Sequence, residues 1–212
     1  ELKQQDGYQP AVLAITGTNG KTTVTALAGQ LVQRAGRSAV VAGNIGPSLL
    51  DTLQVRLHYQ DLPQVWVLEL SSFQLEASDG FEPDAATVLN LTQDHLDWHG
   101  DMDAYAAAKA RVFGQRGTLV LNRNDTRVMA MRPAEPAKSG RAPKPAARTV
   151  VTFGTDMPAA PGDFGLEMVG GMVWLVRAQE ADETQRRRKD VEEELHIQRL
   201  MPADALRIRG RH

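Results

Sequence analysis

Apolar residues gather in short runs that return at regular intervals along the first 153 residues of the chain. Each run is rich in Val, Leu and Ile and is nearly continuous, without alternation of apolar and polar side chains. This pattern is typical of strands that are buried on both faces of a parallel sheet. The predicted strands are Ala11–Ile15, Ser38–Ala42, Val65–Leu70, Ala85–Leu91, Thr118–Asn122 and Thr149–Phe153.

Helical spacing occurs between these runs. An apolar stripe at intervals of three and four residues predicts a helix that ends near Gly36, a residue suited to a helix C-terminus. Asp101 and Asp103 open a second predicted helix, which runs through Ala104–Phe113 and closes at Gly114. Alternating strands and helices predict an α/β fold with a doubly wound, mostly parallel sheet. The stripe of the first helix consists of Val24, Leu27, Ala28, Leu31 and Val32.

The pattern changes after residue 153. Phe164–Met168 and Met172–Arg177 flank the turn sequence Val169-Gly170-Gly171, and this spacing predicts a β-hairpin. A further strand is predicted over Leu195–Leu200. These strands would add a C-terminal antiparallel edge extension to the parallel sheet.

Two segments lack apolar periodicity and are expected to be mobile insertions. Residues 132–148 are rich in Pro, Ala and basic side chains, and residues 179–194 carry a mixed-charge run. The basic stretch 186–189 could form a nucleic-acid patch, but acidic residues flank it on both sides, which favours a solvated loop. We therefore expect no nucleic-acid partner.

Composition narrows the class of protein. Of the 212 residues, 42% are hydrophobic and 24% charged, and the net charge is -2, which is typical of a soluble globular protein. No run of about 18 apolar residues occurs, so no membrane insertion is expected. The absence of cysteine excludes disulfides, thiolate metal sites and a cysteine nucleophile. The polar first residues, which lack an initiator Met, lead us to expect a part of a longer protein.

A glycine-rich loop follows the first predicted strand and leads directly into the first predicted helix, which is the context of phosphate-binding loops. Glycines let backbone N–H groups converge on phosphate oxygens, and the helix N-terminus adds further N–H groups. Lys21 would reach the β- and γ-phosphates of ATP, and the Thr22 hydroxyl would bind Mg²⁺. The strict motif has a further Gly where this chain has Ile15, so a glycine-rich turn is the alternative. The loop residues are Gly17, Thr18, Asn19, Gly20, Lys21, Thr22 and Thr23.

Three polar residues in later elements are candidates for metal or catalytic chemistry. Glu69 lies inside an apolar run near a strand end, where a buried carboxylate is costly unless it is paired or binds a metal such as Mg²⁺. The alternative for Glu69 is a solvent-facing strand end. His95 follows another strand and could be a ligand, a base or a loop cap. Lys109 shares a helix face with Tyr105 and Val112, and a lysine in such a place usually extends its amine to solvent.

Five motifs, in order along residues 10–125, resemble the Mur ligase family in its central ATP-binding domain. The stretch Ser71-Ser72-Phe73-Gln74 is similar to the form in the family member that adds D-glutamate, and it differs from the form in sister ligases. The motifs are Thr16–Thr23, Ala42–Gly46, Leu68–Leu75, Thr92–Asp97 and Tyr105–Arg111.

The resemblance implies two Mg²⁺ sites beside the ATP, whose triphosphate would lie in the glycine-rich loop. Thr22 and Glu69 match ligands of one ion. His95 matches a ligand of the second ion, and Lys109 matches a lysine that is carbamylated in this family. Because CO₂ reacts with a neutral amine, Lys109 would need a pKa that burial has lowered. Together with Lys21, His95 and Lys109 are therefore the catalytic candidates.

The resemblance also implies the reaction. An ATP-dependent ligase of this family would phosphorylate the carboxylate of UDP-N-acetylmuramoyl-L-alanine (UDP-MurNAc-L-Ala) and join the acyl phosphate to D-glutamate for peptidoglycan synthesis. Asn44, Ser71 and His95 match positions near the muramoyl substrate. The alternatives are a sister ligase (diaminopimelate- or lysine-adding, or folylpolyglutamate synthase), a non-catalytic nucleotide-binding module, and an unrelated phosphate-loop ATPase.

Family members have three domains: a UDP-binding N-terminal one, the central one, and a C-terminal one that completes the adenine and amino-acid sites. Residues 1–212 are therefore expected to be the central domain alone and not to turn over by themselves. The resemblance further leads us to expect a cytoplasmic monomer whose partners are small molecules.

Overall fold

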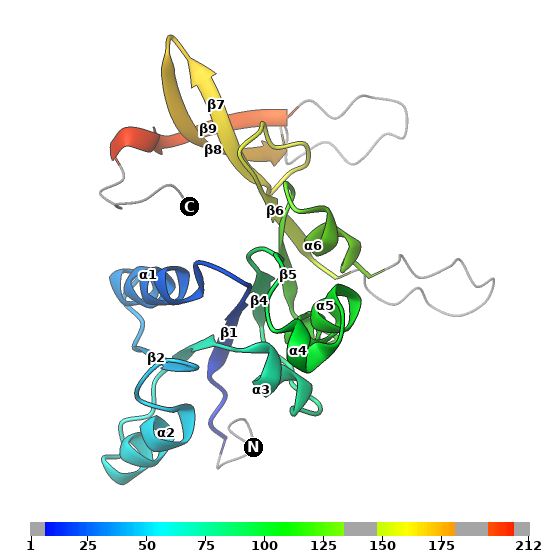
Figure 1. The fold of residues 1–212 in the computed structure, drawn as a ribbon. Helices are drawn as coiled ribbons and strands as arrows, with labels where there is room; N and C mark the ends of the chain where they lie inside the picture. Colours follow the sequence, from blue (N-terminus) through cyan, green and yellow to red (C-terminus); the bar gives the residue numbers. More distant parts are fainter. Residues whose placement is uncertain (1–6, 134–147, 181–194, 206–212) are drawn as a thin grey trace, which may run out of the picture.

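The computed structural model describes residues 7–133, 148–180 and 195–205. Within these residues, nine strands form one sheet in the order β2-β3-β1-β4-β5-β6-β7-β8-β9 (Figure 1). The pairs among β1 to β6 are parallel, and β7, β8 and β9 pair in antiparallel fashion. The predicted α/β fold with a mostly parallel sheet and a C-terminal antiparallel extension is confirmed.

The strand order reverses beside β1, which lies between β3 and β4 at the centre of the parallel part. Open parallel sheets bind ligands at the carboxyl ends of the strands, next to such a reversal. Glu69 at the end of β3 pairs with Ile15 on one side and Gly43 on the other, so three strand ends lie at one level. The strands are β1 (Ala11–Thr16), β2 (Ala39–Gly43), β3 (Val65–Glu69), β4 (Ala85–Val88), β5 (Thr118–Asn122) and β6 (Val150–Phe153).

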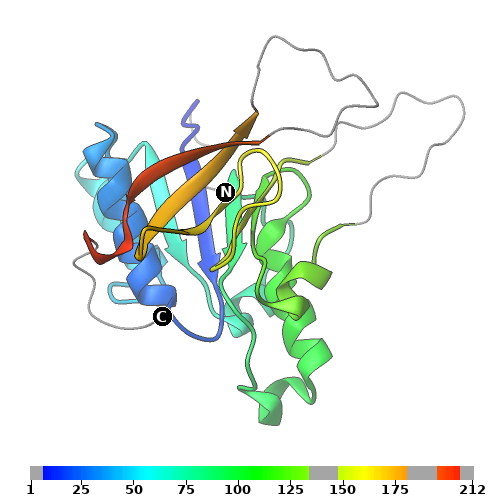
Figure 2. The same ribbon diagram turned by 90° about the horizontal axis from the view of Figure 1, so that it is seen from above.

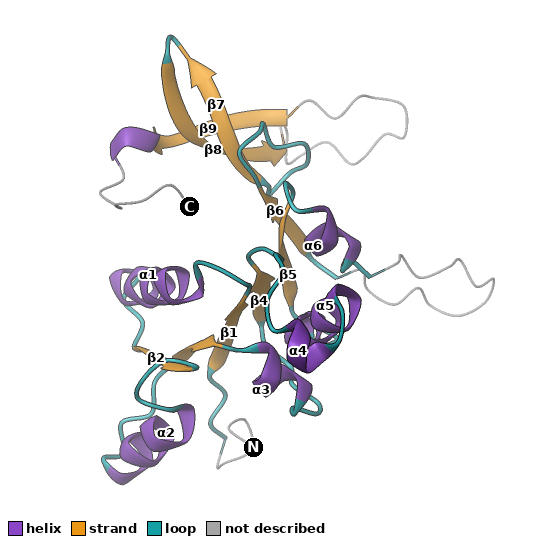
Figure 3. Ribbon diagram, in the orientation of Figure 1, coloured by secondary structure: helices purple, strands orange, loops and turns teal. Residues whose placement is uncertain are grey.

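Helices cover both faces of the parallel sheet (Figure 3). On one face, α1 (Lys21–Arg34) packs through Val24 and Ala28 against a core that includes Val67. The larger core lies on the opposite face and contains the fully buried Trp66. The remaining helical elements of the first 133 residues are α2 (Leu49–His58), α3 (Ser72–Glu76), α4 (Leu96–His99), α5 (Met102–Ala110), the 3₁₀ turn η2 (Arg111–Phe113) and α6 (Thr126–Ala130).

The apolar stripe of α1 is only partly buried. Ala28 and Val32 face the sheet as predicted, but Leu31 is 64% exposed, so its assignment to the buried stripe is wrong. The helix approaches the sheet most closely at Gly29, where an added Cβ would meet Val41 Cγ2 at 2.5 Å. Leu31 lies about 200° around the helix from Gly29 and therefore points outward.

The antiparallel extension is joined to the parallel sheet by one registered pair, Phe153 with Phe164. Arg123 adds a side-chain link between the two parts, because its guanidinium donates to Thr152 Oγ1 at 2.7 Å and to the carbonyl of Phe164 at 3.0 Å. Figure 2 shows the last strands crossing over the side of the sheet that carries α1. The elements of the extension are β7 (Phe164–Val169), β8 (Met172–Glu180), β9 (Leu195–Pro202) and η3 (Ala203–Ala205).

Several predicted boundaries differ from the structure by one to three residues. The strand predicted to reach Leu91 ends at Val88, because the chain then turns toward the glycine-rich loop. The helix predicted to reach Phe113 ends at Ala110 and continues as the 3₁₀ turn η2. Of the predicted insertions, residues 134–147 and 181–194 lie outside the described residues. Gln179 and Glu180 were wrongly assigned to the second insertion, because they pair with β9 as the end of β8. In the described ranges, no helix has the length and apolar character that crossing a membrane requires.

Candidate active site

The glycine-rich loop joins the end of β1 to the start of α1. Gly17 and Gly20 adopt positive φ angles of 152° and 81°. A side chain at Gly17 would be strained, because the φ angle is one that L residues rarely adopt and the Cβ would lie 3.0 Å from Leu89 Cβ. The first-turn N–H groups of α1 have no acceptor within the helix, and they share the positive end of the helix dipole. The loop therefore has a backbone geometry that suits an anion.

Two side chains at the end of the loop make polar contacts beside it. Lys21 folds back over the loop, and its Nζ donates to the carbonyl of Thr18 at 2.9 Å. A phosphate oxygen is a stronger acceptor for this ammonium than a carbonyl. Thr22 points toward β3, where its hydroxyl donates to Glu69 Oε2 at 2.8 Å. Thr23, in the same turn, is exposed.

Glu69 is a buried carboxylate without a cationic partner among the described residues. It is 2% exposed, so the alternative of a solvent-facing strand end is wrong. Its recorded side-chain hydrogen-bond partners are neutral: the Thr22 hydroxyl and, at 3.4 Å, the amide Nδ2 of Asn44. A buried anion of this kind is costly unless a cation compensates it. The hydroxyl and carboxylate oxygens of Thr22 and Glu69 thus fit one Mg²⁺ ion.

Gly43 lets the end of β2 approach Glu69. An added Cβ at Gly43 would lie 2.1 Å from the carbonyl oxygen of Glu69, and φ is +118°. This contact distance is impossible, so only glycine permits the approach. The next residue, Asn44, then donates its backbone N–H to the same carbonyl at 2.8 Å and places its side chain near the carboxylate.

Replacing Gly43 by Ala is expected to lower the free energy of unfolding by about 3 kcal/mol or more, since overpacking and backbone strain act together. Gly36→Ala is the matched control, because Gly36 also has a positive φ of +78° but no atom within 4 Å of its added Cβ. The control should lose only about 1–2 kcal/mol. Urea unfolding of the three chains measures both changes. Equal losses would show that steric contact with Glu69 is unimportant.

Lys109 reaches the phosphate loop from α5. It is 2% exposed, and its Nζ donates to Thr16 Oγ1 at 3.2 Å and to the carbonyl of Gly17 at 3.0 Å. Burial and the positive charge of Lys21 lower the pKa of Lys109 from 10.5 to about 8, against an opposing effect of Asp94. The expectation that the Lys109 amine extends to solvent is wrong, because the side chain is buried. With this pKa, about a tenth of the amine is neutral at pH 7.

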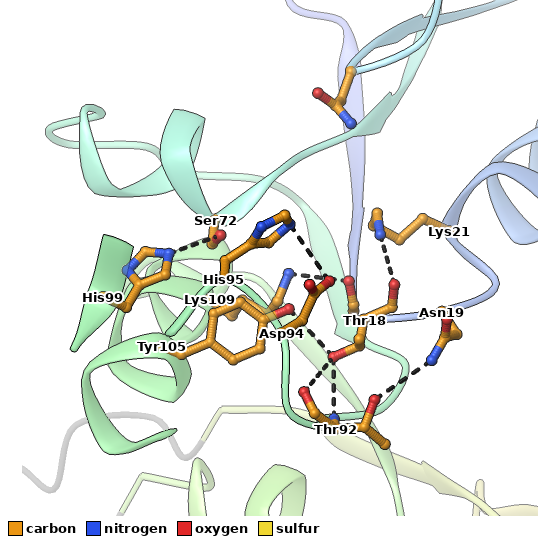
Figure 4. A network of polar contacts seen from close by, with 12 residues as sticks. Thr18, Asn19, Lys21, Ser72, Thr92, Asp94, His95, His99, Tyr105 and Lys109 are labelled. Carbon is orange, nitrogen blue, oxygen red and sulfur yellow. Dashed lines mark hydrogen bonds and ion pairs between the residues drawn. The ribbon is translucent and has the colours of Figure 1, made fainter. Parts of the chain in front are cut away.

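His95 lies on the same side of the loop as Lys109 (Figure 4). It adopts a left-handed backbone conformation, with φ 52°, at the start of α4. Its ring lies 5.0 Å from that of Phe73 and 6.4 Å from that of Tyr105, and its Nε2 is 3.4 Å from Asp94 Oδ2. The described residues hold no cluster of three His, Asp or Glu side chains that could bind a metal. The donor set fits a second Mg²⁺ only if Lys109 becomes anionic.

Ser71 has a clear structural role beside the site. It caps α3, because its hydroxyl accepts the N–H of Gln74 at 3.2 Å while the Gln74 side chain accepts the N–H of Ser71 at 2.9 Å. Asn44 directly follows β2, and Ser71 lies two residues after β3, at the same sheet edge as the loop. Their contact with a substrate stays a prediction.

Three residues around the loop were missed by the sequence analysis. Tyr105 is buried and lies on α5 one turn before Lys109; its hydroxyl is 3.2 Å from Thr18 Oγ1. Asn90 and Thr92, which follow β4, bind the backbone and hydroxyl groups of the loop. One signal was present: polar residues directly after a buried strand lie at the same sheet edge as the loop.

The chain is similar to one protein family and to several curated proteins and solved structures. A family model described as Mur ligase middle domain matches residues 15–168. UDP-N-acetylmuramoylalanine–D-glutamate ligases from Polaromonas sp. (strain JS666) and Albidiferax ferrireducens are 67% and 65% identical over 99% and 100% of this chain. The chain spans only 35% and 42% of their lengths. A solved UDP-N-acetylmuramoyl-L-alanyl-D-glutamate–2,6-diaminopimelate ligase has a TM-score of 0.59 and 30% identity, with coverage of 84% of this chain and 39% of that one.

Proposed function

The chain belongs to the Mur ligase family, and on this premise we propose that it is the phosphate- and metal-binding part of a ligase that joins D-glutamate to UDP-MurNAc-L-Ala. The proposal is carried by one observation: the Thr22–Glu69 pair and the buried amine of Lys109 converge on one phosphate loop. The choice of D-glutamate is supported by relatives of that name at 67% and 65% identity.

In the first step, the γ-phosphoryl group of ATP moves to the substrate carboxylate, which yields ADP and an acyl phosphate. The bond from the γ-phosphorus to the β,γ-bridging oxygen breaks as a bond to a carboxylate oxygen forms. Catalysis of such a transfer is mostly positioning and charge neutralisation. The N–H groups at the start of α1 and the Lys21 ammonium would bind the phosphates. Thr22 and Glu69 would hold Mg²⁺, which supplies positive charge at the β- and γ-phosphates.

In the second step, the amine of D-glutamate attacks the acyl carbon, phosphate leaves, and the nitrogen loses a proton. We propose that Lys109 is carbamylated through its neutral amine, and that the carbamate and His95 hold a second Mg²⁺. The lowered pKa of Lys109 supports this proposal, because only the neutral amine adds CO₂. Asn44 and Ser71 would border the muramoyl group.

The chain's 212 residues are, in this proposal, one domain of a cytoplasmic monomer. The UDP moiety, the adenine and D-glutamate would be bound by further domains. We call a chain that carries residues 1–212 together with those domains the full-length ligase. Cytoplasmic ATP and a nucleotide-linked sugar are the substrates that this assignment requires.

The test is phosphate release by the full-length ligase with ATP, UDP-MurNAc-L-Ala and one of three amino acids. D-Glutamate should support turnover, while meso-diaminopimelate and L-lysine should not. Preference for either of the other amino acids would contradict the D-glutamate assignment. The 212-residue chain alone should show no steady turnover, and full-length rates from it would contradict the domain assignment.

A further inference from the structure

We propose that Asn90 is a positioning residue of the phosphate loop, which fixes the conformation in which the loop binds nucleotide phosphates. The inference rests on the proposed function only in taking this loop as the nucleotide site. Asn90 follows β4, the strand beside β1, and lies 71 positions from Asn19 in the sequence. It belongs to none of the groups that would touch the reacting atoms.

The side chain of Asn90 binds the peptide units on both sides of Asn19. Its Oδ1 accepts the N–H of Asn19 at 2.9 Å, and its Nδ2 donates to the carbonyl of Asn19 at 3.1 Å. The backbone carbonyl of Asn90 also accepts the N–H of Thr18 at 3.0 Å. These three hydrogen bonds fix three successive peptide units of a loop whose glycines would otherwise allow many orientations.

The carbonyl of Asn19 decides where the next N–H points. In a planar trans peptide, the carbonyl and the N–H point in opposite directions. Because Asn90 Nδ2 holds the carbonyl of Asn19, the N–H of Gly20 in the same peptide unit points away from the Asn90 side chain. If this peptide flipped, a carbonyl oxygen would face the phosphates in place of a donor. Asn90 thus selects the orientation that an anion requires.

The hydrogen bonds of Asn90 also compensate for a departure of the loop from the strict phosphate-loop motif. The chain has Ile15 where the strict phosphate-loop sequence has a further glycine, so the loop has fewer residues with which to curl around an anion. A neighbouring strand end supplies the missing constraint. Thr92 extends it, since its N–H donates to Thr18 Oγ1 at 3.1 Å and the Thr18 hydroxyl donates to the carbonyl of Thr92 at 3.2 Å.

The test compares binding of Mg·ATP and of Mg·tripolyphosphate to the 212-residue chain and its variants by calorimetry. Asn90→Ala should raise Kd about tenfold for both ligands, the size expected for about 1.4 kcal/mol of lost positioning. An equal change for tripolyphosphate is expected because the effect lies in the phosphate loop and not in an adenosine contact. Asn90→Asp should not restore affinity, since a carboxylate cannot donate to the carbonyl of Asn19.

Asn122→Ala is the matched control. Asn122 also makes two side-chain hydrogen bonds, to the carbonyl of Leu89 at 2.9 Å and from the N–H of Asn124 at 2.9 Å, and neither touches the loop. Asn122→Ala should leave Kd unchanged, even if it lowers the midpoint of unfolding. An unchanged Kd in Asn90→Ala, or equal changes in the two Ala variants, would overturn the inference and leave the proposed function standing. Absence of binding by the unaltered chain would overturn both.

Discussion

Replacing Lys109 by Ala is expected to lower the turnover of the full-length ligase by about a thousandfold. The variant removes the buried amine that lies against the loop at Thr16 and Gly17, and with it the proposed carbamate. Loss of a preorganised charge-stabilising group typically costs about 10²–10³ in rate. Lys109→Arg should be as inactive, because a guanidinium stays charged and cannot take up CO₂. Phosphate release under saturating substrates measures both variants.

The same residue predicts a pH dependence. The pKa of Lys109 is about 8, below its ordinary value, so the amine is half neutral near pH 8 and charged at lower pH. Each unit below pH 8 lowers the neutral fraction about tenfold. Turnover in CO₂-depleted buffer should therefore fall on the acid side and respond to added bicarbonate. A ligase whose turnover is unaffected by Lys109→Ala would instead support the reading of residues 1–212 as a non-catalytic nucleotide-binding module.

The second large effect is expected for Glu69→Gln. This variant keeps the size of the side chain but removes its charge, so the proposed Mg²⁺ loses a carboxylate ligand next to Thr22. We expect turnover to fall about 10²–10³-fold, and the Mg²⁺ concentration for half-maximal rate to rise. Titration of Mg²⁺ at fixed ATP separates the two changes.

The control for Glu69→Gln is Glu167→Gln. Glu167 lies on β7, in the antiparallel extension, and pairs with Arg199 at 2.7 Å. Its replacement removes an equal charge far along the sheet from the loop, so turnover and Mg²⁺ dependence should stay as they are. If the two variants behaved alike, Glu69 would have no special part in metal binding.

The sheet could be predicted from the sequence because its signals are local and strong. All six parallel strands were found, and Thr118–Asn122 has the predicted bounds. The helices α2, α3, α4 and α6 were not predicted. Three of these have only four or five residues and are held by caps such as Ser71 and Asp125, so apolar periodicity cannot reveal them.

The sequence identified candidate residues of the site, but it did not predict which residues they contact. Glu69 and Lys109 stood out because a charged side chain in an apolar pattern is costly. Nothing local shows that Lys109 donates to Thr16, 93 positions away, in place of reaching solvent. Tyr105 and Asn90 were missed for a similar reason: their partners come from the loop after β1, and the sheet order alone brings them together.

The narrow junction between β6 and β7 has a consequence for local unfolding. One registered pair, the guanidinium of Arg123 and the carboxylate of Asp163, which accepts the N–H of Thr152 at 2.6 Å, join β7, β8 and β9 to the parallel sheet. By contrast, β1 pairs with β3 over five residues and with β4 over four. The free energy of local opening is lower for a segment that has fewer contacts with the rest of the protein. The amides of β8 and β9 should therefore exchange with solvent deuterium through an opening that leaves β1 protected. The edge strands and the part of the sheet that carries the phosphate loop should then form two cooperative units within one continuous sheet.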